Sequence, residues 1–254
     1  MADTEWTKDG KLKYEAVIFD MGGVFLPDPF QKFKDFEERM DLPPGSVSKV
    51  ILEGWVEGPW GKIMVGEMAI PEFSNILCGH LSRNTGKLIN PDTWTNFMAT
   101  YDNAKPYPEM ITAIKCVRVH GLKTALLTNN CFVDEGKSET LMPLDRCLFD
   151  VVTESCVVGC RKPDPAAYTV CLQSLNVAPH KVVFLDDQTK NVKAAQALGI
   201  TAIQVRNCTQ ALSELSEVLG VPLDRLDPGM IPISPRTSFD MGVWETGLFA
   251  KSVN

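Results

Sequence analysis

Residues 16–24 read Ala16-Val17-Ile18-Phe19-Asp20-Met21-Gly22-Gly23-Val24, and this stretch decides the fold of the chain. A short apolar run ends in a carboxylate and two glycines follow, a pattern typical of a buried parallel strand with Asp20 at its carboxyl end. Ligands of open α/β sheets bind at that edge of the sheet. An unpaired buried carboxylate is costly, so we expect Asp20 to meet a metal ion, a hydrogen-bond donor or a reacting group.

Further apolar runs repeat this pattern along the chain. They predict parallel strands over Thr124–Leu127, Phe149–Val152, Val182–Leu185 and Ala202–Val205. Helical patterns lie between most of them, over Tyr107–His120, Pro165–Leu175 and Asn191–Leu198. Asp164 precedes the second of these helices as an expected N-cap. Strands that alternate with helices predict an α/β fold with a doubly wound, Rossmann-like parallel sheet.

The stretch between the first two strands breaks this alternation. Apolar residues recur there at helical spacing within 30–40, 47–55, 70–81 and 94–101. We therefore predict an all-helical domain of residues 27–105, inserted after the first strand of an α/β core made of residues 1–26 and 106–254. Both ends of the insert connect beside Asp20, which places it to cover the site. Its aromatic stripes are expected to form core more than to contact a ligand.

The bulk properties exclude several classes of function. The 254 residues carry a formal net charge of -7, which argues against nucleic acid as a partner. Apolar runs are too short for membrane insertion, and the polar N-terminus resembles neither a signal nor a transit peptide. We expect an intracellular, cytoplasmic protein, with a mitochondrial or peroxisomal location and a homodimer left open. The eight cysteines are expected to be reduced thiols, and the three histidines lie too far apart to suggest a triad.

Polar residues follow the other predicted strands. The second strand is followed by Thr128-Asn129-Asn130, and the fourth by Asp186-Asp187 with Asn191 beyond. Lys162 lies between them, just before a predicted helix. Clustered carboxylates repel one another and need a cation, and an all-oxygen donor set favours Mg²⁺ over zinc. Thr128, Asn129 and Lys162 are suited to binding an anion. An anion beside Mg²⁺ and a free carboxylate suggests phosphoryl transfer through an aspartyl-phosphate.

The order of these motifs resembles that of the haloacid dehalogenase superfamily, whose cap is inserted where this chain has its helical stretch. Within the superfamily, the chain is similar to the phosphatase-like N-terminal domain of soluble epoxide hydrolases and to the related domain that precedes some acyl-CoA dehydrogenases. The resemblance implies a small phosphorylated substrate and a Mg²⁺ cofactor. It makes Asp20 the nucleophile. The implied metal ligands are Asp20, the Gly22 carbonyl, Asp186 and Asp187, and the implied phosphoryl-binding residues are Thr128, Asn129, Lys162 and Asn191.

Gly22 departs from the pattern of the family's phosphatases. They carry there a second Asp that protonates the leaving group and later activates water, and losing such a group costs about 10²- to 10⁴-fold in rate. Three outcomes are therefore expected. The chain is a slow phosphatase or one specific for good leaving groups, or it uses water, Glu67 or Lys62 in place of the second Asp. Alternatively, it binds a phosphorylated ligand without turning it over. A dehalogenase-like hydrolase is a further alternative, because dehalogenases also lack this Asp; they need no Mg²⁺, however, whereas the Asp186-Asp187 pair favours a metal.

Overall fold

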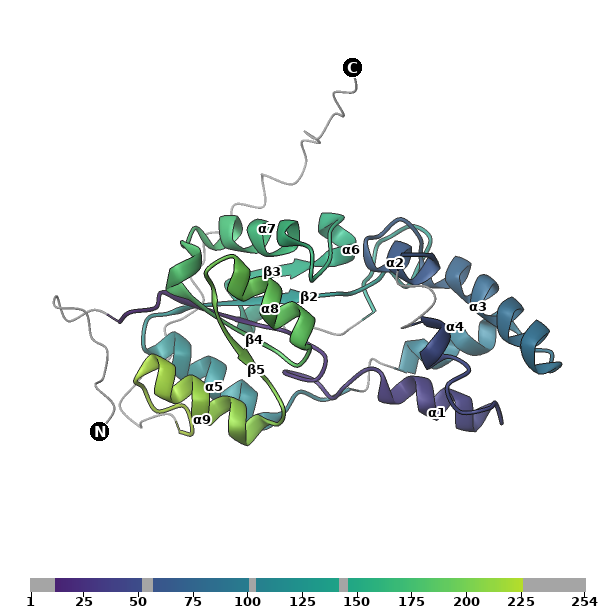
Figure 1. Cartoon of the computed structure of the whole chain (residues 1–254), viewed down its shortest axis with the longest axis horizontal. Coiled ribbons are helices and arrows are strands. Elements are labelled where there is room, and N and C mark those ends of the chain that lie inside the picture. Colours follow the sequence, from purple (N-terminus) through teal and green to yellow (C-terminus); the bar gives the residue numbers. More distant parts are fainter. Residues whose placement is uncertain (1–11, 52–56, 101–103, 142–145, 226–254) are drawn as a thin grey trace, which may run out of the picture.

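The computed structural model describes residues 12–51, 57–100, 104–141 and 146–225. Its centre is a parallel sheet in the order β3-β2-β1-β4-β5 (Figure 1). The strands are β1 (Ala16–Phe19), β2 (Lys123–Thr128), β3 (Val151–Glu154), β4 (Val182–Asp186) and β5 (Thr201–Gln204). Helices lie on both faces, so the predicted doubly wound α/β fold is confirmed.

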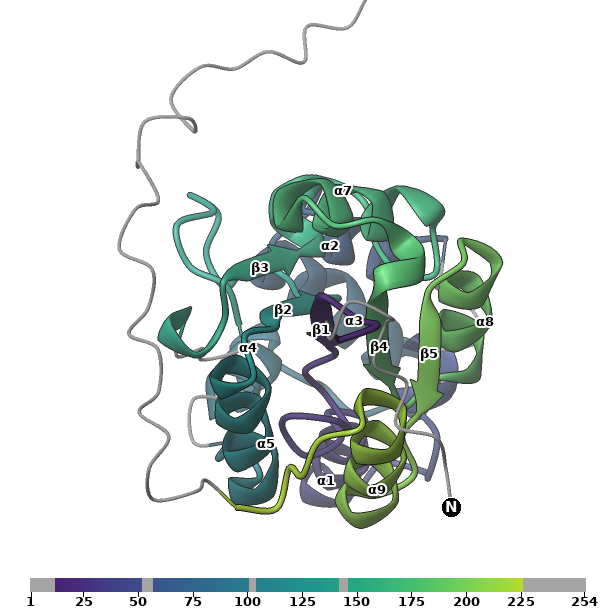
Figure 2. The same ribbon diagram turned by 90° about the vertical axis from the view of Figure 1, so that its left-hand side faces the viewer.

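The alternation of side chains along the strands divides the core between the two faces of the sheet. Phe19 and Leu185 point into a large cluster that includes Met110. Ile18 and Phe184 point the other way, into a cluster with residues of α7. Figure 2 shows the helices of the first face below the sheet and α7 above it, with α8 at its side. The helices are α5 (Pro108–Val119) and α9 (Cys208–Leu219) on the first face, and α7 (Pro165–Leu175) and α8 (Thr189–Ala197) on the second.

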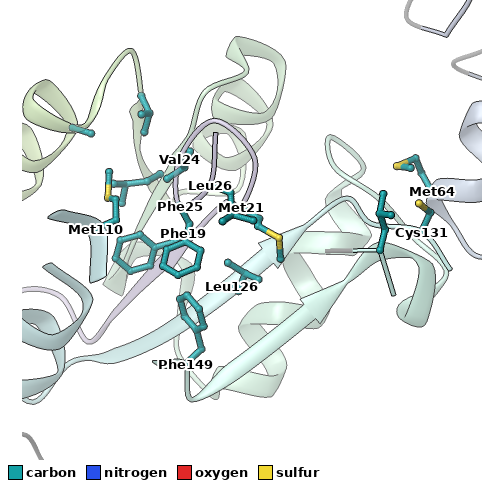
Figure 3. Packing of buried hydrophobic residues seen from close by; sticks show 14 of the residues in the cluster. Phe19, Met21, Val24, Phe25, Leu26, Met64, Met110, Leu126, Cys131 and Phe149 are labelled. Carbon is teal, nitrogen blue, oxygen red and sulfur yellow. The ribbon is translucent and has the colours of Figure 1, made fainter. Parts of the chain in front are cut away.

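Aromatic rings fill the centre of the first face. Phe149 lies 6.3 Å from Phe19 and 5.7 Å from Phe25, measured between ring centroids (Figure 3). The edge-to-face contact between Phe149 and Phe25 adds about 0.5–1.5 kcal/mol to the stabilisation that comes from burying the rings. This packing fixes the segment after β1, and with it the position of Asp20.

A helical insert separates β1 from α5, as predicted. Its helices are α1 (Gln31–Arg39), α2 (Pro59–Met64), α3 (Ile70–Thr85) and α4 (Pro91–Ala99), with a further helical turn over residues 48–51. Trp94 packs edge-on against Phe36, with ring centroids 4.8 Å apart, and lies tilted against Phe33 at 5.8 Å. The apolar cluster runs without a break from the sheet into the insert. The backbone N–H of Tyr107 donates to the Phe25 carbonyl (3.0 Å), which ties together the two connections of the insert.

Some local predictions were wrong. β3 begins two residues later than expected and ends on Glu154. Residues 59–64 form the helix α2, which lies between two of the predicted helical stretches and was not predicted. The short helix α6 (Ser155–Val158) was not predicted. Trp55, Tyr101 and the proline-rich tail from residue 226 lie outside the described residues, within which no helix is both long and apolar enough to cross a bilayer.

Candidate active site

Three carboxylates meet where β1 and β4 end side by side. Asp20 directly follows β1, Asp186 is the last residue of β4, and Asp187 comes next. One oxygen from each lies within 4.8 Å of the others. Chain connections leave β1 and β4 toward opposite edges of the sheet, which makes this the switch point at which open α/β sheets bind ligands.

Lys162 joins two of these carboxylates. Its Nζ lies 2.7 Å from Asp20 Oδ1 and 2.8 Å from Asp186 Oδ2, and the side chain is only 1% exposed. Burial alone would lower the pKa of the ammonium group, but the carboxylates of Asp186 and Asp20 raise it. The Asn129 side chain fixes the Lys162 backbone, donating to its carbonyl (3.0 Å) and accepting from its N–H (2.9 Å). The lysine is therefore held charged and in place.

Asp186 is held by the start of α8. It accepts hydrogen bonds from the Gln188 N–H (2.8 Å) and from Asn191 Nδ2 at 3.0 and 3.1 Å. The Tyr168 hydroxyl donates to the Asn191 carbonyl (2.9 Å) and ties α8 to α7. Asn191 therefore faces the site, one helical turn beyond Asp187, and holds Asp186.

Asp187 is the least satisfied of the three carboxylates. Its Oδ1 is buried and has no hydrogen-bond partner among the described residues. A Cβ atom on Gly23 would lie 2.8 Å from Asp187 Oδ2, so only glycine permits this approach, and its φ of 77° also favours glycine. A buried oxygen without a partner, beside two further carboxylates, fits a hard divalent cation such as Mg²⁺.

Burial and mutual repulsion perturb these carboxylates. Burial raises the pKa of Asp20 to about 8; Lys162 opposes the rise, and Asp186 and Asp187 add to it. Burial, with the charge of Asp186, raises the pKa of Asp187 to about 6. A metal cation would reverse both shifts by stabilising the charged forms.

A pocket opens from Asp20 toward the helical insert. Its polar side carries Thr128, Asn129, Asn130 and Gln188, and its charged residues besides Asp20 and Asp187 are Arg161, Lys162 and Lys190. The opposite wall is apolar and comes mainly from the insert, with Pro29, Phe30, Phe33, Trp60, Met64 and Met98. Figure 3 shows Met64 near Cys131, which belongs to the loop after β2. The insert therefore supplies the apolar surface of the pocket, and the strand ends supply the polar one.

The structure brings together the residues expected to bind the metal ion and the phosphoryl group, and it differs from the sequence analysis in three details. The carboxylate that bonds to Lys162 beside Asp20 is Asp186, whereas the sequence analysis had assigned Asp186 to the metal ion alone. Lys62 and Glu67 are exposed and do not line the pocket, so they are poor replacements for the missing acid. Phe33 belongs to the core, as expected, yet it also lines the pocket. Asp164 accepts from the Ala166 N–H (2.9 Å) as the N-cap of α7.

Asn130 is a residue of this site that the sequence analysis did not assign. It is 1% exposed and lines the pocket, and its amide donates to Glu154 Oε1 (2.9 Å). Glu154 also accepts from the Thr140 hydroxyl (2.7 Å) and pairs with Arg146. This network fixes the loop after β2. A glutamate at the end of a strand was the available signal, but its partners lie in segments that only the folded chain brings near.

Comparisons with known proteins agree with this geometry. The model of the haloacid dehalogenase-like hydrolases matches residues 14–199. The chain belongs to this family. It is 37% identical over 232 residues to acyl-CoA dehydrogenase family member 10 of Mus musculus, covering 90% of the chain and 21% of that protein. It is 32% identical over 237 residues to bifunctional epoxide hydrolase 2 of Sus scrofa, covering 89% of the chain and 41% of that protein. The chain thus spans less than half the length of either relative.

A solved structure shares the architecture. A family enzyme of Bacteroides thetaiotaomicron, solved in complex with magnesium and inorganic phosphate, superposes with a TM-score of 0.56 over 76% of this chain and 94% of its own, at 16% identity. At this identity the match shows the fold of a haloacid dehalogenase-like hydrolase, with its parallel sheet and helical insert.

Proposed function

We propose that the chain is a Mg²⁺-dependent phosphatase that transfers a phosphoryl group to Asp20 and then to water. The observation that carries this proposal is the group of three carboxylates within 4.8 Å of one another, with Lys162 bonded to two of them. Asp20, Asp186, Asp187 and the Gly22 carbonyl would hold the ion, which would neutralise charge and polarise the phosphoryl oxygens. The enzyme from Bacteroides thetaiotaomicron was solved with magnesium and inorganic phosphate, which supports Mg²⁺ as the ion and a phosphate as the substrate.

The chain's own residues would divide the remaining work. An Asp20 oxygen is the nucleophile, and Lys162 neutralises charge on it and on the phosphoryl oxygens. Thr128, buried at the end of β2 and lining the pocket, would donate its hydroxyl to the phosphoryl group. The side-chain amide nitrogen and oxygen of Asn129, and the side-chain nitrogen of Asn191, are already hydrogen-bonded. We therefore propose that these two residues position Lys162 and Asp186 more than they bind substrate.

The helical insert would act as a cap that selects the substrate. We propose that residues 27–105 form this cap on a core of residues 1–26 and 106–254. The apolar wall of the pocket, with Phe30, Trp60 and Met98, supports a small phosphorylated molecule whose organic part is apolar. Burying such a group stabilises the complex by about 25 cal/mol per Å² of apolar surface.

The proposal is tested with 4-nitrophenyl phosphate. We expect release of nitrophenol that needs Mg²⁺, stops on addition of EDTA, and is lost in Asp20→Asn. Asp35→Asn is the matched control, since Asp35 is exposed on α1 and lies outside the pocket. Activity that survives Asp20→Asn would rule out the covalent route, and Mg²⁺-dependent binding of phosphate without any turnover would favour a non-catalytic binding protein.

A further inference from the structure

Pro29 fills the space into which a side chain at residue 22 would extend. A Cβ atom on Gly22 would lie 2.6 Å from Cδ and 2.9 Å from Cγ of Pro29, closer than real Cβ contacts come. Pro29 and Gly22 both line the pocket. The chain around Pro29 is also constrained, because the Phe30 N–H donates to Asp28 Oδ1 (2.8 Å) and Phe30 packs on Phe33 at 5.6 Å. The packing around Gly22 therefore leaves no room for a side chain at residue 22.

The rest of the pocket offers no replacement for that acid. Among the described residues that line it, the carboxylates are Asp20 and Asp187, both part of the metal-binding cluster, and there is no histidine or glutamate. The other titratable residues that line it are Cys131, whose thiol pKa is raised by burial, and the cations Arg161, Lys162 and Lys190. Guanidinium and ammonium groups hold their protons at neutral pH, so they stabilise an anion better than they protonate one. This pocket is suited to a leaving group that departs with its negative charge.

We propose that the substrate is a phosphate whose leaving group departs unprotonated as a weakly basic anion. Carboxylate, phenolate and phosphate are such anions, so the substrate class comprises acyl phosphates, aryl phosphates and phosphoanhydrides, and excludes simple alkyl phosphates. This inference rests on the proposed function and adds the identity of the leaving group to it. Pro29 then determines specificity, because its ring occupies the space of the acid that alkyl phosphates require.

The chemical steps balance without an acid. An Asp20 oxygen bonds to phosphorus while the bond from phosphorus to the leaving oxygen breaks, and the electron pair stays on that oxygen. Water then attacks phosphorus, the bond to Asp20 breaks, and inorganic phosphate leaves while one proton passes to solvent. Since no side chain at residue 22 takes that proton, the second step is slow. We therefore expect a burst of leaving group, equal in amount to the enzyme, before the steady state.

The first test uses the wild-type protein and a series of phosphates. We expect kcat/KM to fall steeply as the leaving group of substituted phenyl phosphates becomes more basic, and alkyl phosphates to react at least about 10²-fold more slowly than 4-nitrophenyl phosphate. Acetyl phosphate, 4-nitrophenyl phosphate and pyrophosphate, compared at equal concentration, identify which anion is preferred. Alkyl phosphates turned over as fast as activated ones would overturn the inference. If no phosphate releases its leaving group and Asp20 acquires no phosphoryl group, the proposed function is overturned as well.

The second test restores the acid. Gly22→Asp alone should gain less than threefold on alkyl phosphates, because Pro29 blocks the new side chain. Gly22→Asp with Pro29→Gly should raise kcat/KM, which reports the departure of the leaving group, at least about tenfold on alkyl phosphates and little on 4-nitrophenyl phosphate. Pro29→Gly alone is the matched control. An equal gain in the single and the double variant would contradict the role of Pro29, and an equal gain on both substrates would contradict the missing acid as the limit.

Discussion

At the scale of single residues, the site depends on how closely a backbone atom and a carboxylate approach one another. A methyl group at residue 23 would push against Asp187, so Gly23→Ala should weaken Mg²⁺ binding at least about tenfold. The positive φ adds a cost of about 1–2 kcal/mol to the folded state. Calorimetric titration with Mg²⁺ measures the first effect, and urea unfolding the second.

Gly121→Ala is the matched control for this substitution. Gly121 has a φ of 82°, and a Cβ atom there would meet nothing within 4 Å. Both variants should lose similar stability, whereas only Gly23→Ala should lose affinity for Mg²⁺. Wild-type affinity in Gly23→Ala would mean that Asp187 does not hold the ion.

Mg²⁺ binding should also depend on pH in a direction set by Asp20. Because burial raises its pKa to about 8, the metal-free protein at pH 7 carries a proton on this carboxyl group that the Mg²⁺ form has lost. Affinity for Mg²⁺ should therefore increase from pH 6 to 8, by up to about tenfold per pH unit. Titration at pH 7 in buffers of different ionisation enthalpy should show nearly one proton released per ion. An affinity that stays constant over this range would contradict the raised pKa.

At the scale of elements, Glu37 joins α1 to the helical turn at 48–51. Its buried carboxylate accepts from the backbone N–H groups of Gly45 (2.7 Å), Val47 (2.8 Å) and Ser48 (3.0 Å). Burial opposes ionisation, but these hydrogen bonds outweigh it and lower the pKa of Glu37 below 4.5. Glu37→Gln should destabilise the fold by about 1–3 kcal/mol, because the amide NH₂ group cannot accept from these donors.

The acid sensitivity of the fold checks the same contact. Since the folded-state pKa of Glu37 is lowered, its stabilisation is present above about pH 4.5 and is lost as pH falls through the folded-state value. Urea unfolding at pH 3 and 7 should therefore show a smaller difference for Glu37→Gln than for wild type. Glu38→Gln, on the exposed side of α1, is the control and should behave as wild type.

The elements show where sequence reasoning succeeds and where it stops. The strands before Asp20 and Asp186 were predictable because burial on both faces leaves an unbroken apolar run. The predicted position of β3 was shifted because the strand ends in the polar residues Thr153 and Glu154. Both are buried, and Glu154 is hydrogen-bonded to Asn130, which is distant in sequence. α2 was missed because it is only six residues long, too short for a helical repeat of apolar residues to stand out.

The site was predictable to the same degree. The charged residues follow strand ends, so topology brings them together whatever the loops do. The pocket wall was not predictable, because Phe33 and Trp60 have the spacing of ordinary core residues and only tertiary packing turns them toward Asp20. The wedge formed by Pro29 against Gly22 is of the same kind, since it depends on the path of the chain after Leu26.

At the scale of the whole molecule, the helical insert is fastened to the core next to the pocket. Lys137 Nζ donates to the Gly66 carbonyl (2.6 Å), the Ile70 N–H donates to the Phe132 carbonyl (3.0 Å), and Arg161 pairs with Glu57 at 3.2 Å. A Cβ atom on Gly66 would lie 2.1 Å from the Cys156 carbonyl oxygen. The insert and the core are therefore in contact through backbone atoms, at Gly66 and Cys156.

Gly66→Ala should loosen this contact. We expect the Ile70 amide to exchange with solvent at least about tenfold faster than in wild type, because its hydrogen bond to Phe132 would break as the insert moves away. Gly86→Ala is the control, since Gly86 has a similar φ of 70° within the insert but faces open space. Hydrogen exchange followed by mass spectrometry over residues 59–70 distinguishes the two variants, and equal exchange in both would contradict the fastening.

The hydrogen bond from the Tyr107 N–H to the Phe25 carbonyl (3.0 Å) has a consequence for how such proteins diversify. The insert leaves and rejoins the rest of the chain at this junction, so recombination there would transplant the whole of it without disturbing the strand ends. An incoming segment would have to bring apolar side chains to replace Phe33 and Phe36, because the core is continuous across the junction. With the proposed role of the insert as a cap, substrate range would then be inherited as one segment, separately from the catalytic residues at the strand ends.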